Sequence, residues 1–167
     1  MSNNNASDLC RENVLKAYAV IGGLTPLKTD CGELCGRACC SPDEDGQGGM
    51  LLFPGEEKLC TGDWRTVEHT AAGELLSCTS PCPRDARPLA CRIFPLTPVF
   101  SKGVWTVRMD ARARVMCPLA RSGVQGVDRE FALAVRKALR LVASTPEGDE
   151  FLRRWQAAED EFRKFSL

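Results

Sequence analysis

The sequence predicts an irregular, cysteine-rich α+β domain, with short strands in its middle and a helical pair at its C-terminal end. Nine of the ten cysteines in the 167-residue chain fall between Cys31 and Cys117, among short apolar runs broken by glycine and proline. After residue 128 the apolar residues change to helical spacing. The length suits a single domain, 1–167, with a cysteine-rich core over 30–120 and a helical hairpin over 128–165.

The composition is typical of a globular protein, with 44% apolar and 26% charged residues. Lys plus Arg and Asp plus Glu each total 22. A net charge of zero argues against a nucleic-acid binder, which needs an excess of positive charge. The N-terminus has no basic segment followed by an apolar run, and no stretch approaches about 18 consecutive apolar residues. We therefore expect a cytoplasmic chain with no nucleic-acid or membrane partner.

The charges are unevenly distributed along the chain. Residues 30–60 contain seven acids and two bases, whereas residues 84–121 contain eight bases and two acids. The simpler interpretation is that these two segments lie side by side. The more specific one is that basic side chains offset the negative charge of metal-bound thiolates. Under that interpretation the candidates are Arg87, Arg92, Arg112 and Arg114.

The elements before the C-terminal pair are short. Asp8 can cap a helix over 9–21, which Gly22 and Gly23 end. Residues 30–48 suit a loop, and residues 50–53, the region around Trp64 and residues 104–109 suit strands. Residues 92–100 carry two prolines, which favours an extended segment at a sheet edge or a loop.

The two C-terminal helices each carry an apolar stripe. Asp128 can cap the first, to Ala143, and Thr145 before Pro146 suits the start of the second. Such stripes mostly pack into the core of their own domain, although a groove for a partner is the alternative. The stripes are Phe131, Val135, Ala138, Leu139 and Val142, then Phe151, Trp155, Ala158 and Phe162.

The cysteines indicate metal binding. Cys31, Cys35 and Cys39 are each four apart, a spacing that lets thiolates reach one ion. Disulfides and inert buried thiols are the alternatives, but disulfides need an oxidising compartment and inert thiols need not cluster. The expected cofactor is zinc or iron, including a 4Fe–4S cluster. The expected ligands are Cys31, Cys35, Cys39, Cys40, Cys78, Cys82, Cys91 and Cys117, and the sequence does not say which of them share an ion.

Two elements carry a resemblance to a known family. The run from Cys31 to Cys40, with the later sequence RPLACRIFP at 87–95, resembles the bacterial and archaeal CxxCxxCC family, also called the YkgJ-type family. That family is described as a zinc- or iron-chelating domain. The resemblance covers about residues 30–120 and implies metal chelation by the cysteines. The matching positions of the later element are Arg87, Pro88, Cys91, Arg92, Phe94 and Pro95.

The chain departs from the family pattern at two places. The first gaps between cysteines hold three residues rather than two, and Cys78 lies closer to Cys82 than the family's corresponding cysteine usually does. A related domain in flagellin lysine methylases is expected to hold an iron–sulfur cluster, so the resemblance leaves both metals open.

Three functions follow from these patterns. A thiolate-bound metal predicts a structural role for zinc, with a protein partner, or a redox role for an iron–sulfur cluster. A metal with an open coordination position would instead make the chain an enzyme or an enzyme's accessory subunit. A disulfide-stapled domain would hold no metal. The single histidine, His69, is expected at the surface or in the core rather than in a site with surplus cysteines.

Overall fold

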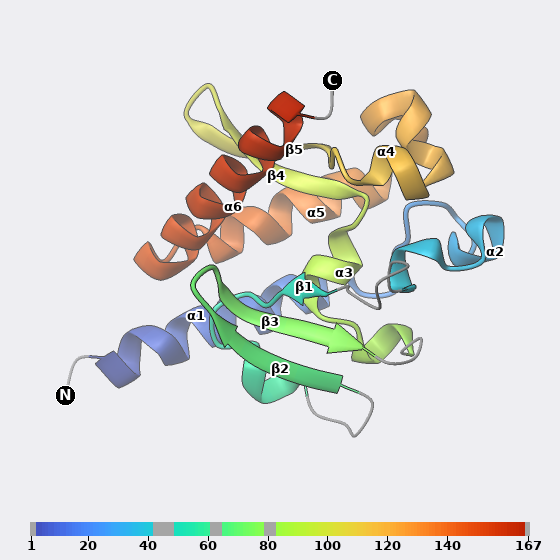
Figure 1. The fold of residues 1–167 in the computed structure, drawn as a ribbon. Helices are drawn as coiled ribbons and strands as arrows, with labels where there is room; N and C mark the ends of the chain where they lie inside the picture. The colour runs from blue at the N-terminus through green and yellow to red at the C-terminus, as the bar shows by residue number, and fades with distance from the viewer. Residues whose placement is uncertain (1–2, 42–48, 61–64, 79–82, 166–167) are drawn as a thin grey trace.

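The computed structural model describes residues 3–41, 49–60, 65–78 and 83–165. It confirms the predicted mixed α+β fold, with small antiparallel sheets and two C-terminal helices (Figure 1). The longer helices are α1 (Asn3–Ile21), α5 (Arg129–Val142) and α6 (Pro146–Phe165). The short ones are α2 (Gly32–Cys35), η1 (Ala38–Cys40), η2 (Glu57–Leu59), η3 (Arg84–Ala86), α3 (Leu89–Ile93), α4 (Ala113–Met116) and η4 (Pro118–Gly126).

In the described parts of the chain, five strands form two separate antiparallel sheets. β1 (Met50–Leu51) pairs with β3 (Gly73–Cys78), which also pairs with β2 (Arg65–Thr70). β4 (Leu96–Ser101) and β5 (Val104–Met109) form a hairpin of their own. The predicted strand over 104–109 is confirmed, and the one over 50–53 is shorter than expected. Trp64 lies outside the described residues.

The main core lies where α1, α5, α6 and the β4–β5 hairpin meet. All five residues of the predicted α5 stripe are buried. Asp128 caps this helix as expected, because its Oδ1 accepts hydrogen bonds from the N–H groups of Glu130 (2.8 Å) and Phe131 (3.2 Å). α5 packs chiefly on α1, while α6 lies along β4. The two C-terminal helices therefore contribute to the core mainly through other elements rather than through each other.

The stripe of α6 is only half buried. Phe151 and Trp155 belong to the core, whereas Ala158 and Phe162 are exposed. The predicted role in core packing therefore holds for Phe151 and Trp155 and fails for Ala158 and Phe162.

The start of α1 differs from the prediction. The helix begins at Asn3, so Asp8 lies inside it and forms an ion pair with Arg11 (3.4 Å) rather than a cap. The polar residues before Asp8 contain no glycine or proline to stop the helix. Leu9 is 49% exposed, whereas the next residue, Cys10, is fully buried.

Two further segments also differ. Residues 30–41, expected as a loop, contain the short helices α2 and η1. Residues 92 and 93, expected to be extended, belong to the helix α3, because Pro88 suits a helix start and Pro95 follows the last turn. The extended segment begins only at Leu96, and Pro98 sits in the hairpin β4–β5 as expected for an edge strand.

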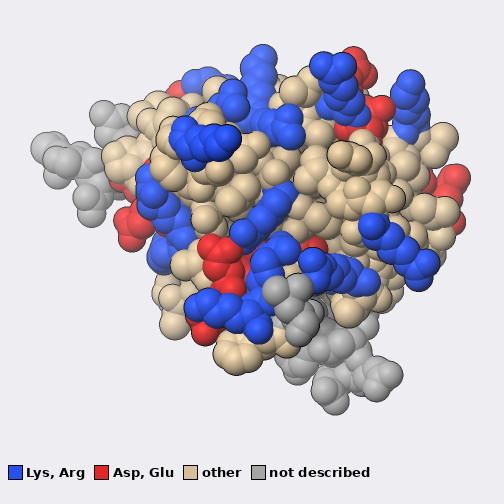
Figure 2. All heavy atoms as spheres, turned by 90° about the horizontal axis from the view of Figure 1, so that it is seen from above, with Lys and Arg blue, Asp and Glu red and all other residues tan. Residues whose placement is uncertain are grey.

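One face of the molecule gathers many Lys and Arg side chains, with acidic groups among them (Figure 2). Ion pairs neutralise part of this charge. Arg108 contacts Asp160 (2.5 Å), and Arg163 contacts the buried Glu159 (2.8 Å). Within the described ranges, no helix combines the length and apolar character that a membrane span requires.

A buried carboxylate joins the core to the segment that carries Cys91. Glu56 is fully buried and accepts hydrogen bonds from the N–H groups of Phe53 (2.9 Å) and Leu89 (2.5 Å) and from the hydroxyl of Tyr18. Burial raises the pKa of Glu56 above its usual value, although the three hydrogen bonds oppose the shift. Leu89 opens α3, so Glu56 holds the start of the helix in which Cys91 lies.

Candidate metal centre

The first three cysteines are positioned by two consecutive tight turns. Cys31 caps α2 and Cys35 ends it. Gly36 (φ 60°) and Arg37 (φ 60°) then both adopt the left-handed conformation, which is uncommon for a residue with a side chain. The chain reverses at these two residues, and η1, which contains Cys39, begins directly after them.

Two more cysteines come from distant parts of the chain. Cys91 lies in the middle of α3, and Cys117 lies between α4 and η4. Burial raises the pKa of the Cys117 thiol, and the backbone N–H groups of Leu119 and Ala120 act in the opposite direction. A lower pKa favours the thiolate, which is the form that binds a metal.

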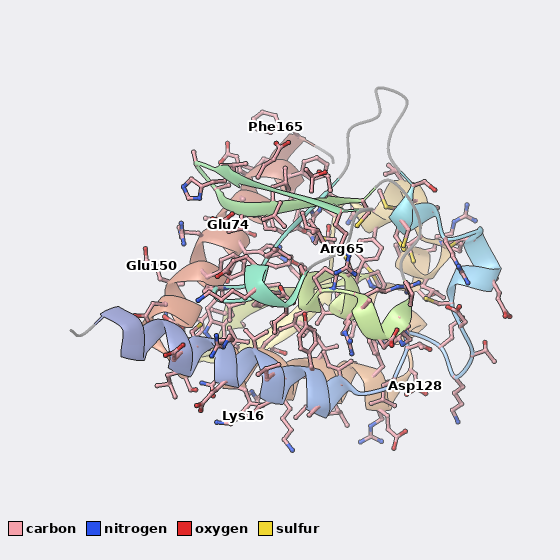
Figure 3. The ribbon with its side chains drawn as sticks, turned by 90° about the horizontal axis from the view of Figure 1, so that it is seen from below. Lys16, Arg65, Glu74, Asp128, Glu150 and Phe165 are labelled. Carbon is pink, nitrogen blue, oxygen red and sulfur yellow. The ribbon has the colours of Figure 1, made fainter. Side chains whose placement is uncertain are left out.

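All five of these cysteines line one small pocket of about 30 Å³. Figure 3 shows sulfur atoms gathered beside the blue α2–η1 segment and the orange α4 region. Apolar side chains complete the walls. The cysteines are Cys31, Cys35, Cys39, Cys91 and Cys117, and the apolar residues include Leu34, Phe94, Met116 and Leu119.

Three arginines line the same pocket, namely Arg84, Arg87 and Arg92. Backbone carbonyls fix two of them: Arg84 donates to Leu24, and Arg92 donates to the carbonyls of Arg87 (2.8 Å) and Asp85 (2.5 Å). Burial and the neighbouring Arg87 lower the pKa of Arg84. Positive charge is therefore concentrated beside the thiols, where it favours their ionised form.

Two of the four candidate arginines of the basic segment lie beside the cysteines. Arg87 and Arg92 line the cysteine pocket. Arg112 instead binds Asp110 through two nitrogens (2.6 and 3.0 Å), and Arg114 is exposed and does not line the pocket. Arg84 was not among the residues predicted from the sequence. It could have been included because it lies in the same basic, cysteine-containing segment as Arg87.

The adjacent thiols Cys39 and Cys40 differ in acidity. A hydrogen bond from Cys39, together with the charges of Arg87 and Arg37, lowers the pKa of Cys40 to about 6 against the effect of burial. The same hydrogen bond, with burial, raises the pKa of Cys39. Cys40 does not line the pocket itself, in keeping with the tendency of neighbouring side chains to point apart.

Of the other predicted ligands that the structure describes, Cys78 also does not line this pocket. Cys78 ends β3 and packs against a second, smaller apolar cluster that includes Leu52, Cys60 and Leu76. Cys82 lies outside the described residues. His69 is exposed on β2, where its Nδ1 lies 2.7 Å from Glu74. It is thus at the surface, one of the two places expected.

The donor chemistry of the pocket fits a thiolate-bound metal, but the sulfur atoms are not drawn together. Among the described residues, no three Cys, His, Asp or Glu side chains converge closely enough to hold an ion as they lie. Binding would require the thiols to close inwards over the pocket.

Comparison with known proteins adds no identification, because no family model, no curated protein and no solved structure matches the chain. The resemblance to the CxxCxxCC family therefore stays a prediction.

Proposed function

We propose that this protein binds a metal centre through cysteine thiolates, as a zinc ion or an iron–sulfur cluster, with a structural or redox role. The observation that carries the proposal is that five cysteines line one pocket. They come from three separate parts of the chain, namely residues 31–39, the helix α3 and the α4–η4 junction. Inert buried thiols have no reason to gather from separate segments in this way.

The surroundings of the thiols support the same proposal. A centre with four thiolates carries net negative charge, and Arg84, Arg87 and Arg92 supply positive charge at the pocket wall. The backbone N–H groups of Leu119 and Ala120 oppose the rise that burial causes in the pKa of Cys117, which favours the metal-binding thiolate. A disulfide-stapled domain needs neither feature.

The pocket size favours a structural or redox role over a catalytic one. Sites for small-molecule substrates usually measure roughly 300–1,000 Å³, whereas this pocket measures about 30 Å³. A bound zinc would stabilise the fold, and a bound iron–sulfur cluster would carry electrons. The residues of the chain would supply the thiolates, and the arginines would offset their charge.

The test is metal analysis with an absorption spectrum on protein purified without oxygen. Stoichiometric zinc without visible absorption supports a structural site, and iron with a broad band near ~400 nm supports a cluster. The matched variants are Cys117→Ala, in the pocket, and Cys10→Ala, which removes a thiol from the core. We expect Cys117→Ala to lose the metal and Cys10→Ala to keep it. Absence of metal in the wild-type protein would overturn the proposal.

A third variant tests whether the ligands are the cysteines that line the pocket or the wider set predicted from the sequence. Cys78 was predicted as a ligand, yet it packs in the second apolar cluster. If the pocket cysteines form the site, Cys78→Ala keeps full metal content. Equal loss of metal from Cys78→Ala and Cys117→Ala would place the ligand set elsewhere.

A further inference from the structure

A second cavity, away from the cysteines, lies between α6 and the turn that joins β2 to β3. It has a volume of about 300 Å³. Ala71 and Ala72 of the turn form one wall, and Met50 and Leu51 of β1 form another. Figure 1 shows this turn next to α6. The volume is at the lower end of the range for small-molecule sites.

The helix side of the cavity is formed by the part of the α6 stripe that does not enter the core. Ala158 and Phe162 lie one and two turns after Arg154, so the three residues follow one line along the helix. Phe151 and Trp155 form the floor. The apolar stripe of α6 is therefore longer than the part that packs in the core, and the remaining part lines this cavity.

The charges at the rim are unequal. Arg112 is paired with Asp110, and the buried Glu159 is paired with Arg163 and with the N–H of Ala111 (2.8 Å). Arg154 is exposed, and it has no ion pair or hydrogen bond to any other described residue. The cavity therefore combines apolar walls with one cation whose charge is not compensated.

We propose that this cavity binds an aliphatic carboxylate, with the hydrocarbon chain against Trp155, Ala158 and Phe162 and the carboxylate on Arg154. A guanidinium group matches a carboxylate in geometry and charge. The small side chains at positions 71, 72 and 158 leave room for a chain of methylene groups, each of which gains about 0.8 kcal/mol on burial. A protein partner fits less well, because a stable interface needs about 800 Å² on each side, far more than a cavity of this size offers.

The experiment is calorimetric titration of the purified, metal-containing protein with decanoate, below the concentration at which it forms micelles. Decanol and acetate serve as comparison ligands, since decanol keeps the hydrocarbon chain without the carboxylate and acetate keeps the carboxylate without the long chain. We expect saturable binding of decanoate and at least about tenfold weaker binding of both others. Decanol bound as tightly as decanoate, or no saturable binding of decanoate, would overturn the proposal.

Two variants locate the site. Arg154→Gln should weaken decanoate binding roughly tenfold while leaving decanol unchanged. Ala158→Phe should fill the cavity and abolish binding of both, and its exposed position lets the fold tolerate the change. Lys137→Gln removes one charge from the exposed side of α5 and should have no effect. Unchanged decanoate affinity in Arg154→Gln would show that the carboxylate binds elsewhere. None of these outcomes depends on the identity of the metal.

Discussion

Between α1 and α5 the molecule buries apolar side chains completely, whereas around the cysteine pocket it leaves thiols and guanidinium groups half-buried. Val14, Ile21, Phe131 and Val135 have no exposed surface. The pocket cysteines sit on or beside helices of three to five residues, which are too short to be stable by themselves. The first region is stabilised mainly by apolar burial, and we infer that the second depends on its ligand.

The largest expected effect is in the core. Phe131→Ala should lower the free energy of unfolding by about 3–5 kcal/mol, because it removes a large, fully buried side chain and leaves a cavity. Urea unfolding should give the same loss with and without the metal, since Phe131 does not line the pocket. Leu133→Ala on the exposed side of the same helix is the control and should change little. A loss that depends on metal would mean that the two regions are not distinct.

An intermediate effect is expected at Glu56, which joins the two regions. In Glu56→Gln one carboxylate oxygen becomes an NH₂ group, which cannot accept the hydrogen bonds that this oxygen accepts. A hydrogen bond to a charged group contributes about 1.5–3 kcal/mol to the free energy of unfolding, and we expect a loss of this size. Because the variant disturbs the start of α3, it should also weaken metal binding. Glu57→Gln, one residue further on, should do neither.

The Glu56 variant also has a pH signature. Burial raises the pKa of Glu56 in the folded protein above its unfolded value. The folded state therefore binds the proton more tightly, and stability from this group is fully present below the unfolded pKa and falls as the pH rises through the folded pKa. The advantage of wild type over Glu56→Gln should be larger at pH 4 than at pH 8 in urea unfolding. A constant difference would contradict the raised pKa.

The smallest effect on the metal-free protein is expected at the pocket itself. Cys117→Ser keeps the shape and hydrogen-bonding capacity of a half-buried side chain, so it should change the free energy of unfolding of the chelated protein by less than about 1 kcal/mol. In the metal-loaded protein the same change should remove most of the stabilisation that the metal provides. Thermal melts with and without a chelator compare the two states. Equal effects in both would show that Cys117 acts only through packing.

Parts of the fold that depend on local signals could be predicted from the sequence. α5 has a capping aspartate and a complete apolar stripe within one helix, and β5 has a clear alternating run. The start of α1 and the helix α3 could not be predicted as well, because the local patterns at Asp8 and Arg92 also fit other structures. The exposure of Phe162 could not be predicted either, because the apolar stripe of α6 continues with the same helical spacing past the buried Trp155.

The sequence predicted that the candidate site consists of cysteines, but not which cysteines line the pocket. Close spacing identified Cys31, Cys35 and Cys39, which do come together. The spacing could not show that Cys91 lines the pocket and Cys78 does not, because both lie in the second cysteine-rich segment. Cys78 ends β3 and packs against the second apolar cluster instead. The inclusion of Arg84 likewise depends on how η3 is oriented against the pocket.

The position of Cys117 has a consequence for how the protein is made. Its sulfur faces the same pocket as Cys31, so much of the chain must be synthesised before the two meet. Closing so long a segment is slow and carries an entropic cost that only the finished contacts repay. During that interval the earlier thiols are accessible to oxidants. Production under reducing conditions, with the metal present from the start, should therefore raise the yield of correctly assembled protein.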